Sequence, residues 1–210
     1  MKWDDFYAQV KDLPVIESQY LHLLYEKKSE VELQLSRWLK QGRVLKLKRG
    51  FYILSEKYRQ VKNFEPYIAA ILRPPSYISL EKALEMHHLI PDAVYTFTSV
   101  TGKRRPAEFI TAAGRFKYVC LKKDYFWGYR VIRGQGGKGY LAEPEKALID
   151  LFYFLRKKVS REFIAGLRLQ DSEQLDIEKL LDYAQRMNIP FIKQGVDLLI
   201  TMLREPKNER

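Results

Sequence analysis

A run of polar side chains near the start of the chain has the chemistry needed to contact nucleic acid. Amide and guanidinium groups donate hydrogen bonds to base edges, and ammonium and hydroxyl groups bind phosphate oxygens. The first group of these donors is Gln34, Ser36, Arg37, Lys40 and Gln41. Further basic residues follow directly at Arg43, Lys46, Lys48 and Arg49. This concentration of donors predicts nucleic-acid binding rather than catalysis.

The first group of donors is predicted to lie on one face of a helix. Val31, Leu35, Trp38 and Leu39 are spaced as the apolar stripe of a 3.6-residue period, which places the polar residues opposite. Ser29 stands three residues before Glu32, a spacing typical of a capping box at the start of a helix. Gly42 is a suitable residue to end that helix.

The second group of donors belongs to a predicted β-hairpin. Residues 44–48 mix apolar and lysine side chains, Lys48–Gly50 supplies a turn, and Phe51–Leu54 forms the returning strand. Two earlier helices are predicted over 3–10 and 16–25, separated near Pro14. This order predicts a winged helix-turn-helix over residues 1–58. Its predicted DNA-binding residues are Gln34, Ser36, Arg37, Lys40, Arg43, Lys46, Lys48 and Arg49.

The charge of the chain favours polyanionic partners. Lysine and arginine number 37 against 26 acidic residues, and the net charge is +11. The surplus lies in two regions: 27–59 holds ten basic and three acidic residues, and 101–140 holds ten and two. A hydrophobic content of 46% is sufficient for a folded core, so disorder is expected only in a flexible tail over 205–210.

Residues 59–204 are predicted to form a mixed α/β domain whose last part is helical. With the N-terminal head, this makes the fold class α+β. Ser79 is expected to cap one of the helices. Helices are predicted over 64–72, 80–88, 144–155, 160–167, 177–187 and 190–203, and strands over 93–98, 109–111, 116–121 and 125–131.

Several features of this second region invite a catalytic interpretation that their details do not support. The glycine-rich run 133–139 lacks the ending of a phosphate-binding P-loop and is interpreted as a mobile connection between strands. Glu143, Glu145 and Asp150 gather around a helix start, where acids complement the helix dipole. Cys120 lies in an apolar run and is expected to be a buried strand residue. The histidines His22, His87 and His88 lack metal-ligand spacing, so we expect no catalytic residue, metal or cofactor.

One enzymatic alternative stays open at this point. Metal-dependent nucleases combine acidic residues with a lysine on neighbouring strands, and Asp92, Glu108 and Lys117 can be placed in such an arrangement. This arrangement lacks the closely spaced pair of carboxylates that a two-metal site requires.

The segment MKWDDFYAQVKDL at the start of the chain is acidic and amphipathic, unlike a signal peptide. The chain also has no apolar run long enough to cross a bilayer. We therefore expect a cytoplasmic protein without membrane contact.

Three sequence blocks resemble the AbiEi antitoxin family. They are Pro75–Leu84 (PSYISLEKAL), Tyr95–Arg105 (YTFTSVTGKRR) and Ala142–Asp150 (AEPEKALID). The basic segment Arg43–Leu54 is also similar to the wing of that family. The resemblance covers about residues 1–155, and the order of the blocks carries more weight than any single block.

The resemblance implies a type IV toxin–antitoxin system associated with phage defence. In such a system the winged helix represses its own operon by binding inverted repeats in double-stranded DNA. The antitoxin domain counteracts a nucleotidyltransferase-like toxin without a stable complex. The family supplies no catalytic residues to transfer, and a stand-alone regulator without a toxin is an alternative.

The second basic region is the candidate patch for the antitoxin's partner. Its members are Lys103, Arg104, Arg105, Lys122 and Lys123, with Arg130 and Arg133 nearby in sequence. The patch is expected to meet an acidic partner or an RNA. The alternative interpretation is that these charges only maintain solubility.

Overall fold

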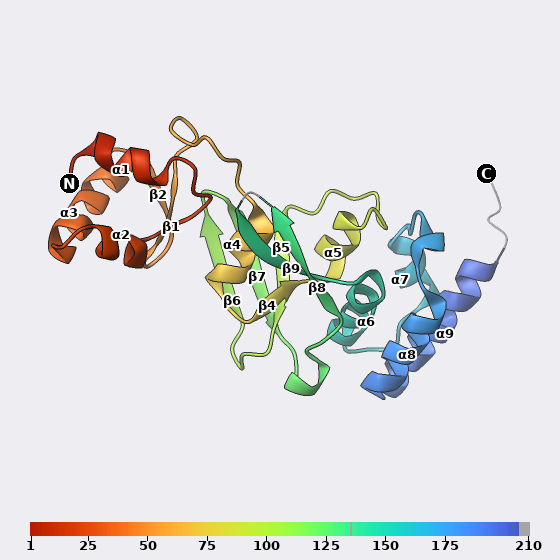
Figure 1. Cartoon of the computed structure of the whole chain (residues 1–210). Coiled ribbons are helices and arrows are strands. Elements are labelled where there is room, and N and C mark those ends of the chain that lie inside the picture. The colour runs from red at the N-terminus through yellow and green to blue at the C-terminus, as the bar shows by residue number, and fades with distance from the viewer. Residues whose placement is uncertain (135, 206–210) are drawn as a thin grey trace.

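The protein has an α+β fold, which the computed structural model describes over residues 1–134 and 136–205 (Figure 1). A small N-terminal unit stands at one end of the molecule, a β-sheet lies in the middle, and the last helices stand at the other end (Figure 1). The N-terminal unit contains, in order, α1 (Trp3–Val10), β1 (Ile16–Glu17), α2 (Ser18–Leu24), α3 (Lys28–Lys40), β2 (Val44–Lys48) and β3 (Phe51–Leu54).

The core of the N-terminal unit is built around the apolar stripe of α3. Val31, Leu35 and Trp38 are buried there, as the periodicity predicted. The Phe6 ring of α1 lies against Trp38, with 4.4 Å between the ring centroids. Aromatic contacts of this kind supply much of the buried apolar surface in so small a unit.

The helix predicted over 16–25 is shorter in the structure. Ile16 and Glu17 instead form β1, which pairs antiparallel with Tyr52 and Phe51 of β3. The three strands then make a sheet in the order β1-β3-β2. Two residues are too few for a recognisable alternation of apolar side chains, so this strand is fixed by its partner rather than by its own sequence.

The second region is organised around a six-stranded mixed sheet with the strand order β6-β7-β5-β4-β9-β8. Strands β5 and β7 run parallel, and β4 and β9 also run parallel, while the other neighbours are antiparallel. The strands are β4 (Ser76–Ile78), β5 (Thr96–Thr101), β6 (Ala107–Thr111), β7 (Gly114–Cys120), β8 (Tyr129–Gly134) and β9 (Gly137–Ala142).

The predictions for this sheet were correct in part. The strand expected at 93–98 begins at Thr96 and continues to Thr101. The strand expected at 125–131 begins only at Tyr129, because a short 3-10 turn occupies Lys123–Tyr125. Cys120 ends β7 and is half-exposed rather than buried.

The glycine-rich run belongs to the β8–β9 hairpin and packs against helix α4 (Glu65–Leu72). A Cβ placed on Gly139 would lie 2.7 Å from the carbonyl carbon of Pro66, and one on Gly137 would overlap the Tyr67 side chain. Only glycine permits so close an approach. The run is therefore part of the packed sheet rather than only a connection, although Gln135 lies outside the described residues.

The remaining helices complete the second region. Helix α5 (Leu80–Met86) packs against β5 and against α6 (Pro144–Leu155). Helix α6 in turn contacts α8 (Ile177–Met187) and α9 (Pro190–Arg204), and α7 (Arg161–Gly166) contacts α9. Glu205, predicted to begin a flexible tail, accepts two 2.7 Å hydrogen bonds from Arg161, and residues 206–210 lie outside the described part.

Apolar contacts also join the N-terminal unit to the second region. Val15, Leu47 and Ile53 come from the N-terminal unit but pack with the buried residues of the second region. None of the helices in the described residues has the length and apolar character required to cross a bilayer.

Candidate nucleic-acid interface

Helix α3 presents a continuous polar face to solvent, opposite its buried stripe. Ser36, Arg37 and Lys40 are exposed there, as predicted. Ser29 and Leu33 are exposed on the same face, and the Leu33 side chain keeps 52% of its surface accessible. Leu33 was not predicted, although its position midway between the apolar stripe residues placed it on the polar side. An exposed aliphatic group among hydrogen-bond donors suits contact with thymine methyl groups.

The two acidic residues of α3 are held at the edges of this face. Glu30 pairs with Lys27 at 3.3 Å, and Glu32 accepts a contact of 3.1 Å from the imidazole of His22. Arg37 and Lys40 lie in the last turn of the helix, away from both acids. The C-terminal half of the face therefore carries only positive charge.

The predicted capping box at Ser29 and Glu32 is wrong. The helix begins two residues earlier than such a box requires, with Lys27 rather than Ser29 at the N-cap position and without a side-chain cap. The Lys27 carbonyl accepts from the amides of Glu30 and Val31, so the first turn closes on the backbone. Glu32 is instead turned towards His22 of α2, which leaves the Ser29 hydroxyl on the exposed face.

Two of the predicted DNA-binding residues, Gln34 within α3 and Arg43 just after it, are less accessible to a ligand. Gln34 is half-buried, and the guanidinium of Arg43 lies 4.9 Å from the centre of the Trp3 ring. Gly42, with a φ of +66°, ends the helix in the left-handed conformation, as predicted. Arg43 therefore packs on the aromatic core as soon as the chain leaves the helix.

The β2–β3 hairpin divides its basic residues between solvent and the second region. Lys46 and Arg49 are exposed, as a wing in contact with phosphates requires. Lys48 instead donates to the carbonyl oxygens of Ile71, at 2.5 Å, and Leu72, at 3.3 Å, at the end of α4. Its ammonium also lies 4.4 Å from the centre of the Phe51 ring.

Lys48 thus connects the β2–β3 hairpin to the C-terminal end of α4 by hydrogen bonds. Free carbonyls at the end of a helix are stabilised by a cation that donates to them. Burial lowers the pKa of Lys48, and the charge of Lys103 lowers it further, while Glu17 opposes the shift. The predicted role of Lys48 as a phosphate contact is therefore not supported by where the side chain lies.

The second basic region is brought together at one end of the sheet. Strands β5 and β7 are parallel neighbours, with Thr101 paired to Cys120, so the segments that follow both strands emerge side by side. The amide of Leu121 donates to the carbonyl of Thr101 at 2.9 Å. The residues of the predicted patch are all exposed in these two segments: Lys103, Arg104, Arg105, Lys122 and Lys123.

The residues of the nuclease alternative have separate ion-pair partners. Asp92 pairs with Arg168, and Glu108 pairs with Arg115. Lys117 lies opposite Glu108 in the β6–β7 register, but no second carboxylate joins them there in the described residues. Over residues 1–134 and 136–205, the structure places no three acidic, histidine or cysteine side chains close enough to hold a metal ion.

A buried polar network beneath the sheet was not anticipated from the sequence. The ammonium of Lys146 donates to Asp150 and, at 3.0 Å, to the hydroxyl of Tyr77. The Tyr77 hydroxyl donates to Asp150 at 2.9 Å, and the Ser79 hydroxyl donates to it at 2.8 Å. Asp150 is therefore not an acid at a helix start, and Ser79 is not a side-chain cap for α5.

The network joins two of the three sequence blocks set out in the sequence analysis. Tyr77 and Ser79 come from 75–84, and Lys146 and Asp150 from 142–150. Burial raises the pKa of Asp150 and lowers that of Lys146, while their mutual attraction opposes both shifts. Burial also raises the pKa of Tyr77, so its hydroxyl stays a donor. The sequence did contain a signal for this pair: Lys146 and Asp150 are four residues apart, the spacing of an intrahelical ion pair, in a helix that is mainly apolar after Lys146.

The other acids at the start of α6 also have specific partners. Glu145 is buried and accepts from the amide of Asp176 at 3.0 Å, and Glu143 accepts from the Tyr183 hydroxyl. Glu143 lies at the N-cap of α6 and Glu145 in its first turn, as predicted, although neither side chain makes a capping hydrogen bond. Their contacts also attach α6 to the segment that begins and forms α8.

Comparisons with known proteins do not place the chain in a family. No protein-family model matches the sequence, and no curated protein matches it significantly.

Proposed function

We propose that residues 1–58 form a winged helix that binds double-stranded DNA, with α3 entering the major groove. The observation that carries the proposal is the exposed face of Ser36, Arg37 and Lys40 on α3, whose acids are paired at its edges. A helix fits the major groove, where guanidinium and hydroxyl groups distinguish base pairs. The element order and the sheet order β1-β3-β2 further support this assignment.

The proposal separates base contacts from phosphate contacts. Arg37 and Ser36 are the candidates for base edges, and Lys40, Lys46 and Arg49 are the candidates for phosphates. Lys48 is left out because its ammonium is bound to α4. The net charge of +11 assists binding through release of counterions from the duplex.

Binding can be measured by fluorescence anisotropy on a duplex taken from the DNA immediately upstream of this gene. A scrambled duplex of equal composition is the control. The proposal expects tighter binding to the upstream duplex and an affinity that falls with salt. Arg37→Ala should cost about 1–3 kcal/mol on the upstream duplex, and Lys46→Ala should weaken both duplexes alike. Equal binding of the unmodified protein to both duplexes would reject sequence-specific recognition.

We further propose that the protein is the antitoxin and autorepressor of a type IV toxin–antitoxin pair. This role rests on the resemblance of the three sequence blocks to the AbiEi family. The spatial convergence of two of the blocks on the network of Tyr77, Ser79, Lys146 and Asp150 favours it, because the resemblance then concerns a structural unit.

A co-expression assay with a nucleotidyltransferase-like protein encoded beside this gene tests the antitoxin role. The unmodified protein should restore growth, and the variant with Lys103, Arg104 and Arg105 changed to Glu should not, while still binding the upstream duplex. Full growth with that variant would exclude the patch from the antitoxin role, and failure of the unmodified protein would exclude the role itself.

A further inference from the structure

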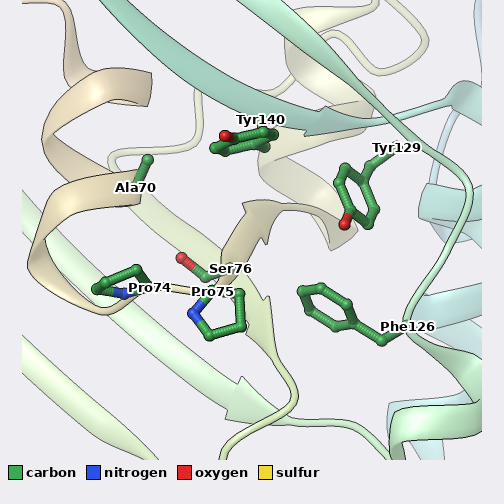
Figure 2. Close-up of a pocket in the computed structure, with 7 residues that line it drawn as sticks. All are labelled: Ala70, Pro74, Pro75, Ser76, Phe126, Tyr129 and Tyr140. Carbon is green, nitrogen blue, oxygen red and sulfur yellow. The ribbon is translucent and has the colours of Figure 1, made fainter.

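A small cavity opens beside the cis Pro74–Pro75 bond, at the end of the sheet that carries the second basic region. Its volume is about 210 Å³. Figure 2 shows the rings of Tyr140, Tyr129 and Phe126 along one side of the space, with Ala70 and Pro74 across from them. This volume is below the range of sites for drug-sized ligands and suits a single planar ring system.

One polar group in the cavity lacks a partner in the described part of the protein. Ser76 keeps only 5% of its surface exposed, and its hydroxyl oxygen makes no hydrogen bond there. Figure 2 shows that this hydroxyl points into the space between Ala70 and Tyr140. A buried hydroxyl without a partner is costly, so a ligand that accepts or donates a hydrogen bond at this point gains affinity.

The aromatic wall is held in place from behind by the buried network. The Tyr129 ring stacks on Tyr77 with 4.7 Å between centroids and an angle of 14°, and the Phe126 ring lies 5.0 Å from Tyr77. Tyr77 is fixed in turn by its hydrogen bonds to Lys146 and Asp150. The wall is therefore preorganised, which lowers the entropic cost of binding a ring against it.

Two segments rich in basic residues, 101–105 and 122–126, border the cavity and are called its basic rim. The hydroxyl of Thr101 donates to the carbonyl of Pro75 at 2.8 Å, which places the segment that leads to Lys103 beside the cavity. A Cβ on Gly102 would lie 4.0 Å from both the Phe126 ring and the stem of Lys123. Within 101–105 and 122–126 there are five basic residues, and Asp124 is the only acid.

We propose that this cavity binds one nucleotide, with the base among the aromatic rings and the phosphate at Lys103 and Lys123. Every nucleobase has a face for stacking and an edge that can hydrogen-bond the Ser76 hydroxyl. An uncharged aromatic group fills the cavity equally well but leaves the basic rim without a counterpart. The site is in the second region and is independent of DNA binding by the N-terminal unit.

The base and phosphate that this cavity would bind can belong to a free mononucleotide or to one residue of a single-stranded nucleic acid. Titration of the full-length protein with AMP, CMP, GMP and UMP, and separately with eight-residue oligo(A) and oligo(U), distinguishes them. Binding of mononucleotides identifies a nucleotide site, and binding of the oligomers alone identifies a single-strand site. N-acetyltyrosine amide serves as the uncharged aromatic probe.

The variants Ser76→Ala and Phe126→Leu test the cavity itself. Loss of the hydroxyl should weaken binding about fivefold, and loss of the stacking ring about tenfold. Lys103→Glu combined with Lys123→Glu should weaken binding and reduce its salt dependence. Ser99→Ala is the matched control, because Ser99 is also a buried serine whose hydroxyl has no hydrogen-bond partner among the described residues, but it does not line the cavity.

Circular dichroism and duplex binding confirm that each variant is folded. The proposal is overturned if no nucleotide or oligomer binds at millimolar concentration, or if Ser76→Ala and Phe126→Leu bind as the unmodified protein does. It is also overturned if N-acetyltyrosine amide binds as tightly as the nucleotides, because the cavity would then select an uncharged ring.

Discussion

The ammonium of Lys146 and the carboxylate of Asp150 form an ion pair with no exposed surface, four residues apart on α6. Such a pair is costly to desolvate, and it is tolerated here because Tyr77 and Ser79 satisfy the remaining hydrogen bonds. Two segments distant in sequence, 77–79 and 146–150, are thereby fixed to each other, and Tyr77 packs against the Tyr129 and Phe126 rings of the cavity wall.

Removal of one partner from this pair should be strongly destabilising. Lys146→Met leaves the Asp150 carboxylate buried without a counter-charge, and we expect a loss of about 3–5 kcal/mol in the free energy of unfolding. The double variant Lys146→Met and Asp150→Leu should recover most of that loss. Urea unfolding measures both, and a double variant no more stable than the single one would contradict the account.

The buried imidazole of His87 should make stability depend on pH. Its Nε2 lies 2.8 Å from the carbonyl oxygen of Ala142. Burial is the main cause that lowers the pKa of His87; Arg130 and His88 also lower it, and the Ala142 carbonyl and Glu145 oppose them. The unfolded chain therefore takes up this proton more readily than the folded protein.

The contribution of His87 is present above the unfolded pKa of about 6.5 and is lost as the pH falls below it. We expect the free energy of unfolding to decrease between pH 7.5 and 5.5, and to decrease less in His87→Gln. His88→Asn, at the adjacent exposed residue, is the control and should keep most of the decrease, because burial is the main cause of the shift and the charge of His88 only a minor one. An identical pH profile for His87→Gln and the unmodified protein would argue against this role.

The close approach of the β8–β9 hairpin to α4 predicts a position-specific glycine requirement. In Gly139→Ala the new Cβ would meet the backbone of Pro66, and we expect a loss of about 1–3 kcal/mol in thermal or urea unfolding. Gly166→Ala is the matched control, because within the described residues nothing beyond its chain neighbours and its own helix backbone lies within 4 Å of its Cβ position. That control should be neutral or slightly stabilising. Equal effects of the two substitutions would refute the packing argument.

The position of Lys48 predicts that it contributes to stability rather than to DNA affinity. Lys48→Met removes two hydrogen bonds to the end of α4 and should cost about 1 kcal/mol of stability. It should leave the salt dependence of duplex binding unchanged, whereas Lys46→Ala should reduce it. A reduced salt dependence in Lys48→Met would restore Lys48 to the phosphate contacts.

Local periodicity was sufficient to predict the helices that bury one face or begin at a proline. The predicted ranges 3–10, 144–155 and 177–187 agree with α1, α6 and α8. Strands β1, β4 and β9 were missed, because the first two have only two and three residues and the third is rich in glycine. Such strands are defined by distant partners, so their own residues carry little signal.

The candidate site also contains some features that local sequence predicts and others that depend on contacts between distant segments. The exposed positions of Ser36, Arg37 and Lys40 follow from the helical period of α3, and the structure agrees with them. The position of Lys48 against α4, the network at Asp150 and the cavity at Ser76 depend on contacts between distant segments. Sequence spacing alone does not specify such contacts.

The central claim is that the exposed face of α3 binds duplex DNA, and a double variant tests it most directly. Arg37→Ala with Lys40→Ala removes two positive charges from this face. Lys157→Ala with Lys158→Ala removes the same charge from an exposed segment beyond α6. Anisotropy titrations with the upstream duplex compare the two variants at equal salt. The account predicts that the first variant loses at least tenfold in affinity, about 1.4 kcal/mol, while the second stays close to the unmodified protein. Equal affinities of the two double variants would contradict the assignment of α3 as the DNA-binding helix.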